Sequence, residues 1–279
     1  MLQIASKILI AATLVLCATG DATPIPPALT LTGAFQIDQD GSDDLDVTGG
    51  STQSGSVFVR EGGVDTTTTF SDETVAGSNP LSGTLTDTGD GFGGTASGSA
   101  TGPLFPPPLQ GYFADTDLGD GETMPLTITN SSTTDFFRIF FSLTFSHSVF
   151  ASGDDGYADS DLEIELDGIE IFESKLLSDT FFGNEIDGTS VPGFGGTLSA
   201  SGPFLFEIIV APNGGFREIT LDHTMEGAIF EPGASTITAD YFLSVDSVVN
   251  LGAIPEPGAY LLFGTGLFAL AALRRRRWS

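Results

Sequence analysis

The amino-acid sequence predicts an all-β protein whose body is an antiparallel β-sandwich of the jelly-roll type. Glycine, serine, threonine and phenylalanine are abundant, whereas lysine and methionine are scarce. Short segments of alternating apolar and polar residues recur between Gly, Asp and Pro breaks, which is the pattern of many short antiparallel strands. Between the two ends of the chain no segment shows the apolar spacing of an amphipathic helix.

The clearest strands lie in residues 111–252, which we assign to the β-sandwich body. In the segment 137–147 every second residue from Phe137 to Phe145 is large and apolar, so this segment predicts a core strand. Further strands are expected at 204–210, 219–225 and 237–245. Several strands with two inner faces favour a sandwich.

The segment 162–172 predicts a β-hairpin, because its central Asp-Gly pair suits a two-residue turn with positive φ at both positions. The register then follows from the turn. It places Leu166 opposite Ile169 and Ile164 opposite Ile171 on the buried face, and Glu165 opposite Glu170 on the other.

Residues 23–110 form either a Gly/Thr-rich β lobe or the first part of the sandwich. Their apolar content is low, which predicts small edge strands or a loosely ordered lobe. The proline-rich segment 103–108 is a stiff, extended stretch and a candidate boundary, or else a long loop within one sandwich.

The N-terminal residues 1–22 have the features of a secretory signal peptide. Lys7 precedes an apolar core from Ile8 to Cys17, and small residues follow. After cleavage the mature chain contains no cysteine, so it forms neither a disulfide nor a thiolate metal site. Its stability must come from packing, or from packing together with bound ions.

The body between the two ends is strongly acidic. Its basic residues are Arg60, Arg138, Lys175 and Arg217, whereas all the acidic residues except Glu256 belong to it, which gives a net charge of about −32. Nucleic acid and anionic lipid are excluded as partners, because binding them requires clustered Lys and Arg. Cations and neutral polymers remain, although an acidic surface also keeps a secreted protein soluble without any ligand.

The C-terminus contains an uncharged apolar run, residues 258–273. As a helix it would be about 24 Å long, a little short of a hydrocarbon core of about 30 Å. The basic cluster behind it consists of Arg274, Arg275, Arg276 and Arg277. These arginines would hold the C-terminus in the cytoplasm and leave the body outside the membrane.

Pro255, Glu256 and Pro257, followed by the apolar run and the four arginines, make residues 253–279 resemble the PEP-CTERM sorting signal of Gram-negative bacteria that produce exopolysaccharide. The resemblance implies a transient inner-membrane anchor, recognition by an exosortase and removal of the tail near the Pro-Glu-Pro. It further implies delivery to the cell surface or extracellular matrix, with exopolysaccharide as a candidate partner. The alternative is a plain single-pass anchor.

Acidic segments are the densest candidate sites. Asp154, Asp155, Asp159 and Asp161 are the predicted calcium ligands, because carboxylates that alternate with glycine on a flexible loop suit this ion. None of the acidic segments, which include Asp115 and Asp117, fits the EF-hand spacing. The alternative is a set of solvated turn residues, since Asp and Gly are favoured in turns without any metal.

Three other features of the sequence bear on a catalytic role. His147 and His223 fall among the apolar, inward-facing positions of their strands, where they either meet at a metal or donate hydrogen bonds to backbone carbonyls. The chain lacks a Gly-x-Ser-x-Gly nucleophile elbow. Glu165 and Glu170 have a spacing that would serve a retaining glycosidase, but an outer hairpin face favours solvated or ion-bridged carboxylates.

These observations together predict a secreted, non-enzymatic protein of the cell surface or extracellular matrix, with a structural or adhesive role. The alternatives are a polysaccharide-active hydrolase and a calcium-dependent carbohydrate-binding module. The binding role would use the acidic segments and exposed tyrosines such as Tyr112, Tyr157 and Tyr241.

Overall fold

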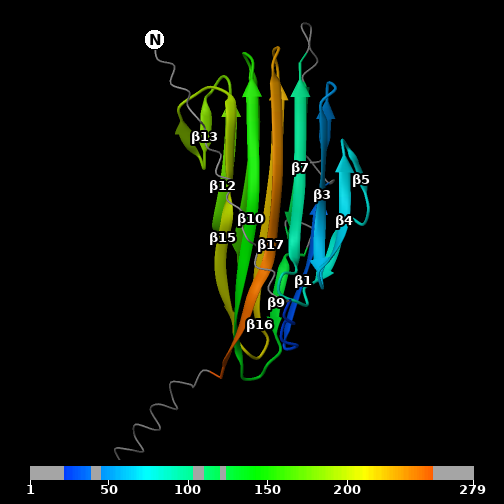
Figure 1. Ribbon diagram of the computed structural model, residues 1–279, viewed down its shortest axis with the longest axis vertical. Coiled ribbons are helices and arrows are strands. Elements are labelled where there is room, and N and C mark those ends of the chain that lie inside the picture. The colour runs from blue at the N-terminus through cyan, green and yellow to red at the C-terminus, as the bar shows by residue number, and fades with distance from the viewer. Residues whose placement is uncertain (1–21, 39–44, 103–109, 120–123, 254–279) are drawn as a thin grey trace, which may run out of the picture.

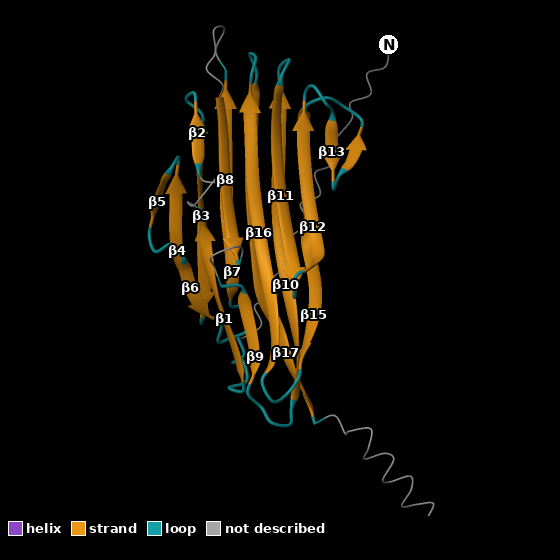
Figure 2. Cartoon of the chain, turned by 180° about the vertical axis from the view of Figure 1, so that it is seen from behind, coloured by secondary structure: helices purple, strands orange, loops and turns teal. Residues whose placement is uncertain are grey.

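The structure is a computed structural model that describes residues 22–38, 45–102, 110–119 and 124–253. These residues form an all-β body of two antiparallel sheets that pack face to face, and they contain no helix (Figures 1 and 2). The predicted transmembrane helix and all but the last residue of the predicted signal peptide lie outside the described residues.

The larger sheet has ten strands, in the order β14-β13-β12-β11-β16-β9-β1-β8-β2, with β6 paired to β1. Its strands are β1 (Leu29–Ile37), β2 (Asp46–Thr48), β6 (Leu81–Thr84), β8 (Gln110–Leu118), β9 (Leu126–Asn130), β11 (Gly156–Leu166), β12 (Ile169–Asp179), β13 (Asn184–Ile186), β14 (Thr189–Val191) and β16 (Gly215–Ile229).

The smaller sheet has seven strands, in the order β15-β10-β17-β7-β3-β4-β5. Its strands are β3 (Thr52–Glu61), β4 (Val64–Ser71), β5 (Thr74–Ala76), β7 (Gly91–Thr101), β10 (Phe136–Ser152), β15 (Gly196–Val210) and β17 (Ala234–Gly252). Strands from residues 23–110 therefore pair with later strands in both sheets.

The strand pattern of the second half of the chain is confirmed. In β10 the alternating apolar residues face the core, where Phe137, Ile139, Phe141 and Leu143 are at most 2% exposed. The three other predicted segments lie within β15, β16 and β17, each of which extends further than the pattern indicated. Alternation is therefore a reliable signal wherever one strand face is buried.

The hairpin between β11 and β12 has the predicted turn, with φ of 54° at Asp167 and 73° at Gly168. Glu165 lies opposite Glu170 as expected, but Ile164 pairs with Phe172 instead of Ile171, because a β-bulge inserts one residue. The expected burial of Ile169 is wrong. Its side chain is 68% exposed, because it stands beside the turn at the end of the hairpin.

The prediction of edge strands or a loose lobe is wrong for β7, which is an interior strand between β17 and β3. Its many glycines reflect close approach of aromatic rings. A Cβ at Gly98 would overlap the ring of Tyr112, and one at Gly94 would overlap that of Tyr241. Low side-chain volume in β7 thus makes room for large rings from elsewhere.

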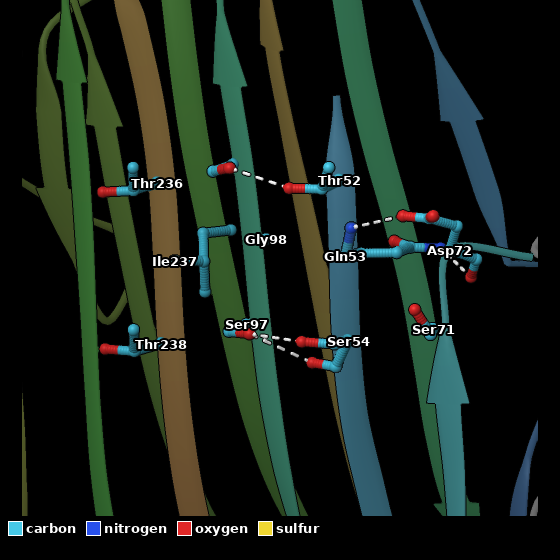
Figure 3. Close-up of a pocket in the computed structure, with 11 residues that line it drawn as sticks. Thr52, Gln53, Ser54, Ser71, Asp72, Ser97, Gly98, Thr236, Ile237 and Thr238 are labelled. Atoms are coloured by element: carbon cyan, nitrogen blue, oxygen red, sulfur yellow. Dashed lines mark hydrogen bonds between the residues drawn. The ribbon is translucent and has the colours of Figure 1, made fainter. Parts of the chain in front are cut away.

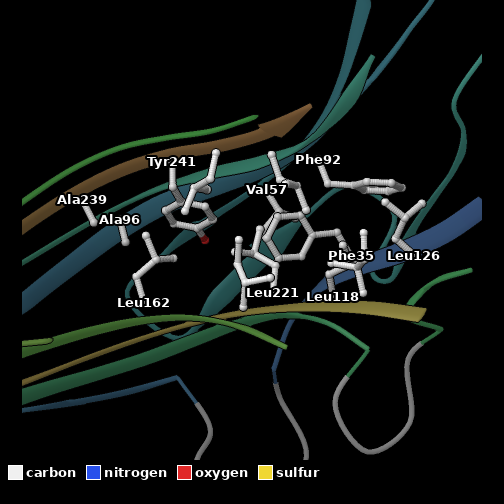
Figure 4. Packing of buried hydrophobic residues seen from close by; sticks show 14 of the residues in the cluster. Phe35, Val57, Phe92, Ala96, Leu118, Leu126, Leu162, Leu221, Ala239 and Tyr241 are labelled. Carbon is white, nitrogen blue, oxygen red and sulfur yellow. The ribbon is translucent and has the colours of Figure 1, made fainter. Parts of the chain in front are cut away.

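The core lies between the two sheets. Figure 4 shows Tyr241, Ala239 and Ala96 of the smaller sheet facing Leu162 and Leu221 of the larger one. Tyr112 is 2% exposed, so its expected exposure is wrong, whereas Tyr241 is 0% exposed, as its position among the apolar residues of β17 indicates. The Tyr112 hydroxyl pairs with Ser235 Oγ at 2.9 Å, which joins β8 to β17 across the core.

We expect Gly98→Ala to lower the free energy of unfolding by about 1–3 kcal/mol, because the added methyl group overpacks the site filled by Tyr112. Gly202→Ala on β15 is the matched control, since a Cβ there meets no atom within 4 Å. Urea unfolding of both variants provides the measurement. Equal losses of stability would contradict the role assigned to Gly98.

Candidate functional site

The structure separates the four predicted calcium ligands into two places. Asp154 and Asp155 lie in the exposed turn between β10 and β11, where the Asp155 carbonyl accepts a hydrogen bond from Phe230 N at 2.9 Å. Asp159 and Asp161 lie on β11 itself, with their side chains on the outer face of the larger sheet. The interpretation of Asp159 and Asp161 as loop residues is therefore wrong.

Lys175 of β12 is shared by two of these carboxylates. Its Nζ lies 2.8 Å from Oδ2 of Asp161 and 3.8 Å from Oδ2 of Asp159. Burial raises the pKa of Asp159 to about 6, against the opposing attraction of Lys175. The Oδ1 atoms of Asp159 and Asp161 are buried and have no hydrogen-bond partner in the described part of the chain.

The carboxylates continue across the neighbouring strands. Glu163 of β11 lies opposite Asp222 of β16, which in turn lies opposite Asp117 of β8. We call the outward side chains of this region the acidic face, which comprises Asp115, Asp117, Asp159, Asp161, Glu163, Asp222 and Glu226. A hollow of about 250 Å³ lies over its β11 side, lined by Asp159, Asp161, Glu163 and Glu226 among others.

Asp115 carries the largest electrostatic perturbation on the acidic face. Burial, followed by the charges of Asp222 and Asp117, raises the pKa of Asp115 to about 10. A neutral Asp115 carboxyl donates a hydrogen bond to the Asp222 carboxylate. Asp117, which is 3% exposed, accepts one from Gln36 Nε2 at 2.9 Å. Because Asp115 retains its proton, its carboxyl group can lie beside those of Asp117 and Asp222 with less charge repulsion.

The two histidines do meet, although neither of the expected arrangements is present. The Ser160 hydroxyl lies between them, 3.0 Å from His147 Nδ1 and 3.1 Å from His223 Nε2, and Ser174 Oγ lies 2.9 Å from His147 Nε2. Burial lowers the pKa of His147 to about 4 and that of His223 to about 3. At neutral pH these are uncharged core residues bonded to hydroxyls.

The outer face of the smaller sheet is different in chemistry. Cross-strand hydroxyl pairs join β3 to β7, at 3.0 Å for Thr52–Ser99, 3.0 Å for Ser54–Ser97 and 2.9 Å for Ser56–Thr95. Thr236 and Thr238 extend two of these rows onto β17. We call this surface the hydroxyl face; a groove of about 400 Å³ crosses it beside the turn at Asp72 (Figure 3).

Within the described residues, no group of three or more His, Cys, Asp or Glu side chains is arranged to hold a metal ion. The calcium ligands therefore remain a prediction. In the same part of the chain no helix is long and apolar enough to cross a membrane.

The last described strand, β17, ends at Gly252, directly before the predicted sorting signal. Residues 253–277 match the family described as the PEP-CTERM protein-sorting motif. The chain is therefore a PEP-CTERM domain-containing protein. The motif residues Pro255, Glu256, Pro257 and Arg274, Arg275, Arg276, Arg277 lie outside the described residues. The motif implies secretion and processing by an exosortase, with delivery to the cell surface or the extracellular space.

The comparisons with curated proteins and with solved structures add no informative relative of this PEP-CTERM protein. No curated protein matches the chain. A structure of the infectious bursal disease virus Gt strain is 9% identical over 88% of this chain and 72% of that one, with a TM-score of 0.12. A structure of the Gx strain of the same virus is 10% identical over 85% and 71%, with a TM-score of 0.13. TM-scores this low carry no information on fold or function.

We expect Asp115→Asn to stabilise the protein increasingly as the pH rises. Because the folded-state pKa of Asp115 lies above its ordinary value of 3.8, folding is most favourable below that value and loses stability as the pH rises toward 10. An asparagine keeps the hydrogen bond without that loss. The gain at pH 8 should be about 1.4 kcal/mol or more, which corresponds to one pKa unit.

Urea unfolding of the Asp115→Asn variant and the parent from pH 5 to pH 9 measures this difference. Asp154→Asn is the control, because Asp154 lies in an exposed turn. A constant difference across the pH range would show that Asp115 is ionised in the folded protein.

Proposed function

We propose that this PEP-CTERM protein is a non-enzymatic structural or adhesive component of the cell surface or extracellular matrix, and that exopolysaccharide is its partner. The observation that carries the proposal is the placement of the polar groups. In the described part of the chain they gather on two broad sheet faces, the acidic face and the hydroxyl face, over a single shared core. Broad faces suit contact with a polymer or a neighbouring molecule.

The described histidines support a role without catalysis. His147, Ser160 and His223 are each at most 2% exposed, so their hydrogen-bonded chain is closed to a substrate. Glu165 and Glu170 lie opposite each other on the β11–β12 hairpin, where they repel each other at the surface. The buried histidine group therefore supplies no nucleophile or general base to a substrate, and Glu165 lines a hollow of about 230 Å³ together with Asp117, Glu163 and Asp222.

The sorting half of the proposal predicts that the mature protein lacks Tyr260–Ser279. Replacing Pro255, Glu256 and Pro257 with alanine should leave the full-length chain in the inner membrane with its C-terminus in the cytoplasm. Intact-mass measurement on surface-extracted protein and cell fractionation provide the readouts. Pro212→Ala, in the turn between β15 and β16, is the control.

The adhesive half is tested in the same strains. Cells that produce the sorting variant, and cells that lack the protein, should attach less to a polysaccharide-coated surface than cells with the parent protein or Pro212→Ala. Undiminished attachment in the deletion strain would remove the adhesive role. Recovery of the intact C-terminus from surface-extracted protein would remove the sorting role.

We also propose calcium as a ligand, because unpartnered carboxylate oxygens of Asp159 and Asp161 lie on the acidic face of a body with few basic residues. A site that binds only the folded protein stabilises it by about 2.7 kcal/mol when free calcium is a hundredfold above Kd. Millimolar calcium should therefore raise the melting temperature of residues 23–253 more than sodium chloride of equal ionic strength.

Two double variants locate the calcium effect. Asp154→Asn with Asp155→Asn tests the turn, and Asp159→Asn with Asp161→Asn tests the strand. The calcium-specific shift should disappear in one of them and persist in the other. Equal melting temperatures in calcium and in matched salt would leave the carboxylates as solvated surface groups.

A further inference from the structure

Three phenylalanines stand in solvent at one end of the sandwich. Phe181 and Phe182 lie between β12 and β13 and are 63% and 84% exposed, and Phe194 lies between β14 and β15 and is 71% exposed. We call these three residues the phenylalanine tip. Single exposed apolar residues are common, but three aromatic rings gathered in two adjoining loops mark an interaction surface.

The loop that carries the first two rings is held in place by hydrogen bonds. Oδ1 of Asp179 accepts from Phe181 N at 2.6 Å and from Phe182 N at 2.7 Å. Thr180 N donates to the Gly156 carbonyl at 3.0 Å, which ties the loop to β11. The rings of Phe181 and Phe182 contact edge to face with centroids 4.9 Å apart. The loop is therefore organised with its rings outward.

A buried asparagine joins the second loop to the first. Asn184, 4% exposed, accepts from Asp179 N at 3.1 Å through Oδ1 and donates to the Gly195 carbonyl at 2.8 Å through Nδ2. A Cβ built on Gly183 would lie 3.7 Å from Cε1 of Phe194, so that ring lies beside the loop of Phe181 and Phe182. One amide side chain thus assembles the tip from two hairpins.

The tip lies at the end of the body opposite Gly252, the last residue of β17. β13, which follows the first loop, is at one end in Figure 1, and β17 reaches Gly252 at the other. β17 has 19 residues, so it spans about 60 Å at about 3.3 Å per residue. A chain attached to the cell through its C-terminus therefore presents the tip to the surroundings.

The size of the tip favours a slender ligand. Three phenyl side chains exposed to this extent offer about 400 Å² of apolar surface, about half of the 800 Å² per partner that a stable protein–protein interface buries. The large exposed apolar residues of these two loops are all phenylalanines. Aromatic rings pack well against the apolar C–H faces of sugar rings.

The charge of the residues around the tip further restricts the chemical class of the ligand. Asp179 lies at the base of the phenylalanine tip, where its Oδ1 accepts hydrogen bonds from the first loop, and Glu185 lies opposite Leu177 on the neighbouring β13. These carboxylates would repel anionic polymers and anionic lipid surfaces. A neutral polymer would not be, and carboxylates accept hydrogen bonds from its hydroxyl groups.

The hydroxyl face is a weaker candidate for the same ligand. Its hydroxyls at Ser54, Ser97, Ser56 and Thr95 already hydrogen-bond to one another across β3 and β7. The rings of the tip, by contrast, have no partner that covers them among the described residues. The two surfaces can be separated by mutation.

We infer that the phenylalanine tip is a carbohydrate-binding site that stacks on a neutral polysaccharide chain. The inference rests on the proposed adhesive function and specifies the end of the molecule that makes the contact. It assigns Phe181, Phe182 and Phe194 as stacking residues and Asn184 as the positioning residue that brings the two loops together.

The test uses the full chain held by its C-terminal tail in phosphatidylcholine nanodiscs. Binding is measured to cellulose, glucomannan and dextran as neutral polysaccharides and to alginate as an acidic one. The parent should bind at least one neutral polysaccharide and not alginate. Phe182→Ala should weaken that binding at least tenfold, and the triple alanine variant should abolish it.

Two variants serve as matched controls. Leu205→Ala removes an apolar side chain that is 67% exposed on β15, away from the tip, and Ser97→Ala removes a hydroxyl from the hydroxyl face. Both should bind as the parent does. Asn184→Ala should also weaken binding, because it separates the two loops. Thermal melts confirm that each variant is folded; if Asn184→Ala does not fold, the exposed phenylalanine variants still decide the result.

Three outcomes would overturn the inference: failure of the parent to bind any of the neutral polysaccharides, undiminished binding by the triple variant, or loss of binding in the controls to the same degree. Flotation with added phosphatidylcholine liposomes, or pairing of the nanodiscs, that depends on the three phenylalanines would instead assign the tip to lipid or to a second copy.

This test is separable from that of the adhesive function. If cells with the triple variant attach as well as the parent while the deletion strain does not, the adhesive function stands and the tip is not its site. If the deletion strain itself attaches normally, the adhesive function fails whatever the tip binds in isolation.

Discussion

The two sheets depend on aromatic rings that fill gaps left by glycine. Tyr112 reaches from β8 across the interface to Ser235 of β17, and its ring occupies the space over Gly98 of β7. Tyr241 of β17 lies over Gly94 and shares a hydrogen bond with Thr116 of β8. Because the chain contains a single cysteine and therefore no internal disulfide, this interlocking fixes one sheet against the other, and both outer faces take their geometry from it.

The outer faces then tolerate opposite polar chemistries for different physical reasons. On the acidic face, carboxyl groups lie close together because Asp115 retains its proton and Lys175 is shared by Asp159 and Asp161. On the hydroxyl face, neutral Ser and Thr side chains satisfy one another across strands. A net charge that would repel a compact fold is thus spread over one sheet and the surrounding loops while the other sheet stays nearly neutral.

Alternation along the chain predicted the strands that face a core, and the Asp-Gly turn predicted the pairing of Glu165 with Glu170. Alternation did not predict β7, because the glycines of this strand make room for aromatic rings from β8 and β17. Which rings pack there depends on partners that are distant in the sequence. Sequence spacing likewise placed Asp154, Asp155, Asp159 and Asp161 in one loop, whereas the strand that begins at Gly156 separates them. The phenylalanine tip was missed for the same reason, since Asn184 joins two loops that the sequence shows apart.

Along the long axis of the sandwich, the order runs from Gly252 at the end of β17 to the phenylalanine tip at the opposite end of the body. The sorting motif follows β17 in the sequence after Gly252. The same strand contributes Tyr241 to the core and Thr236 and Thr238 to the hydroxyl face. A rigid antiparallel body transmits that order over its full length, because its strands pair continuously from one end to the other. The loops at the far end are therefore held at a fixed distance from the end of β17 at Gly252, which is the geometry that the proposed adhesive contact requires.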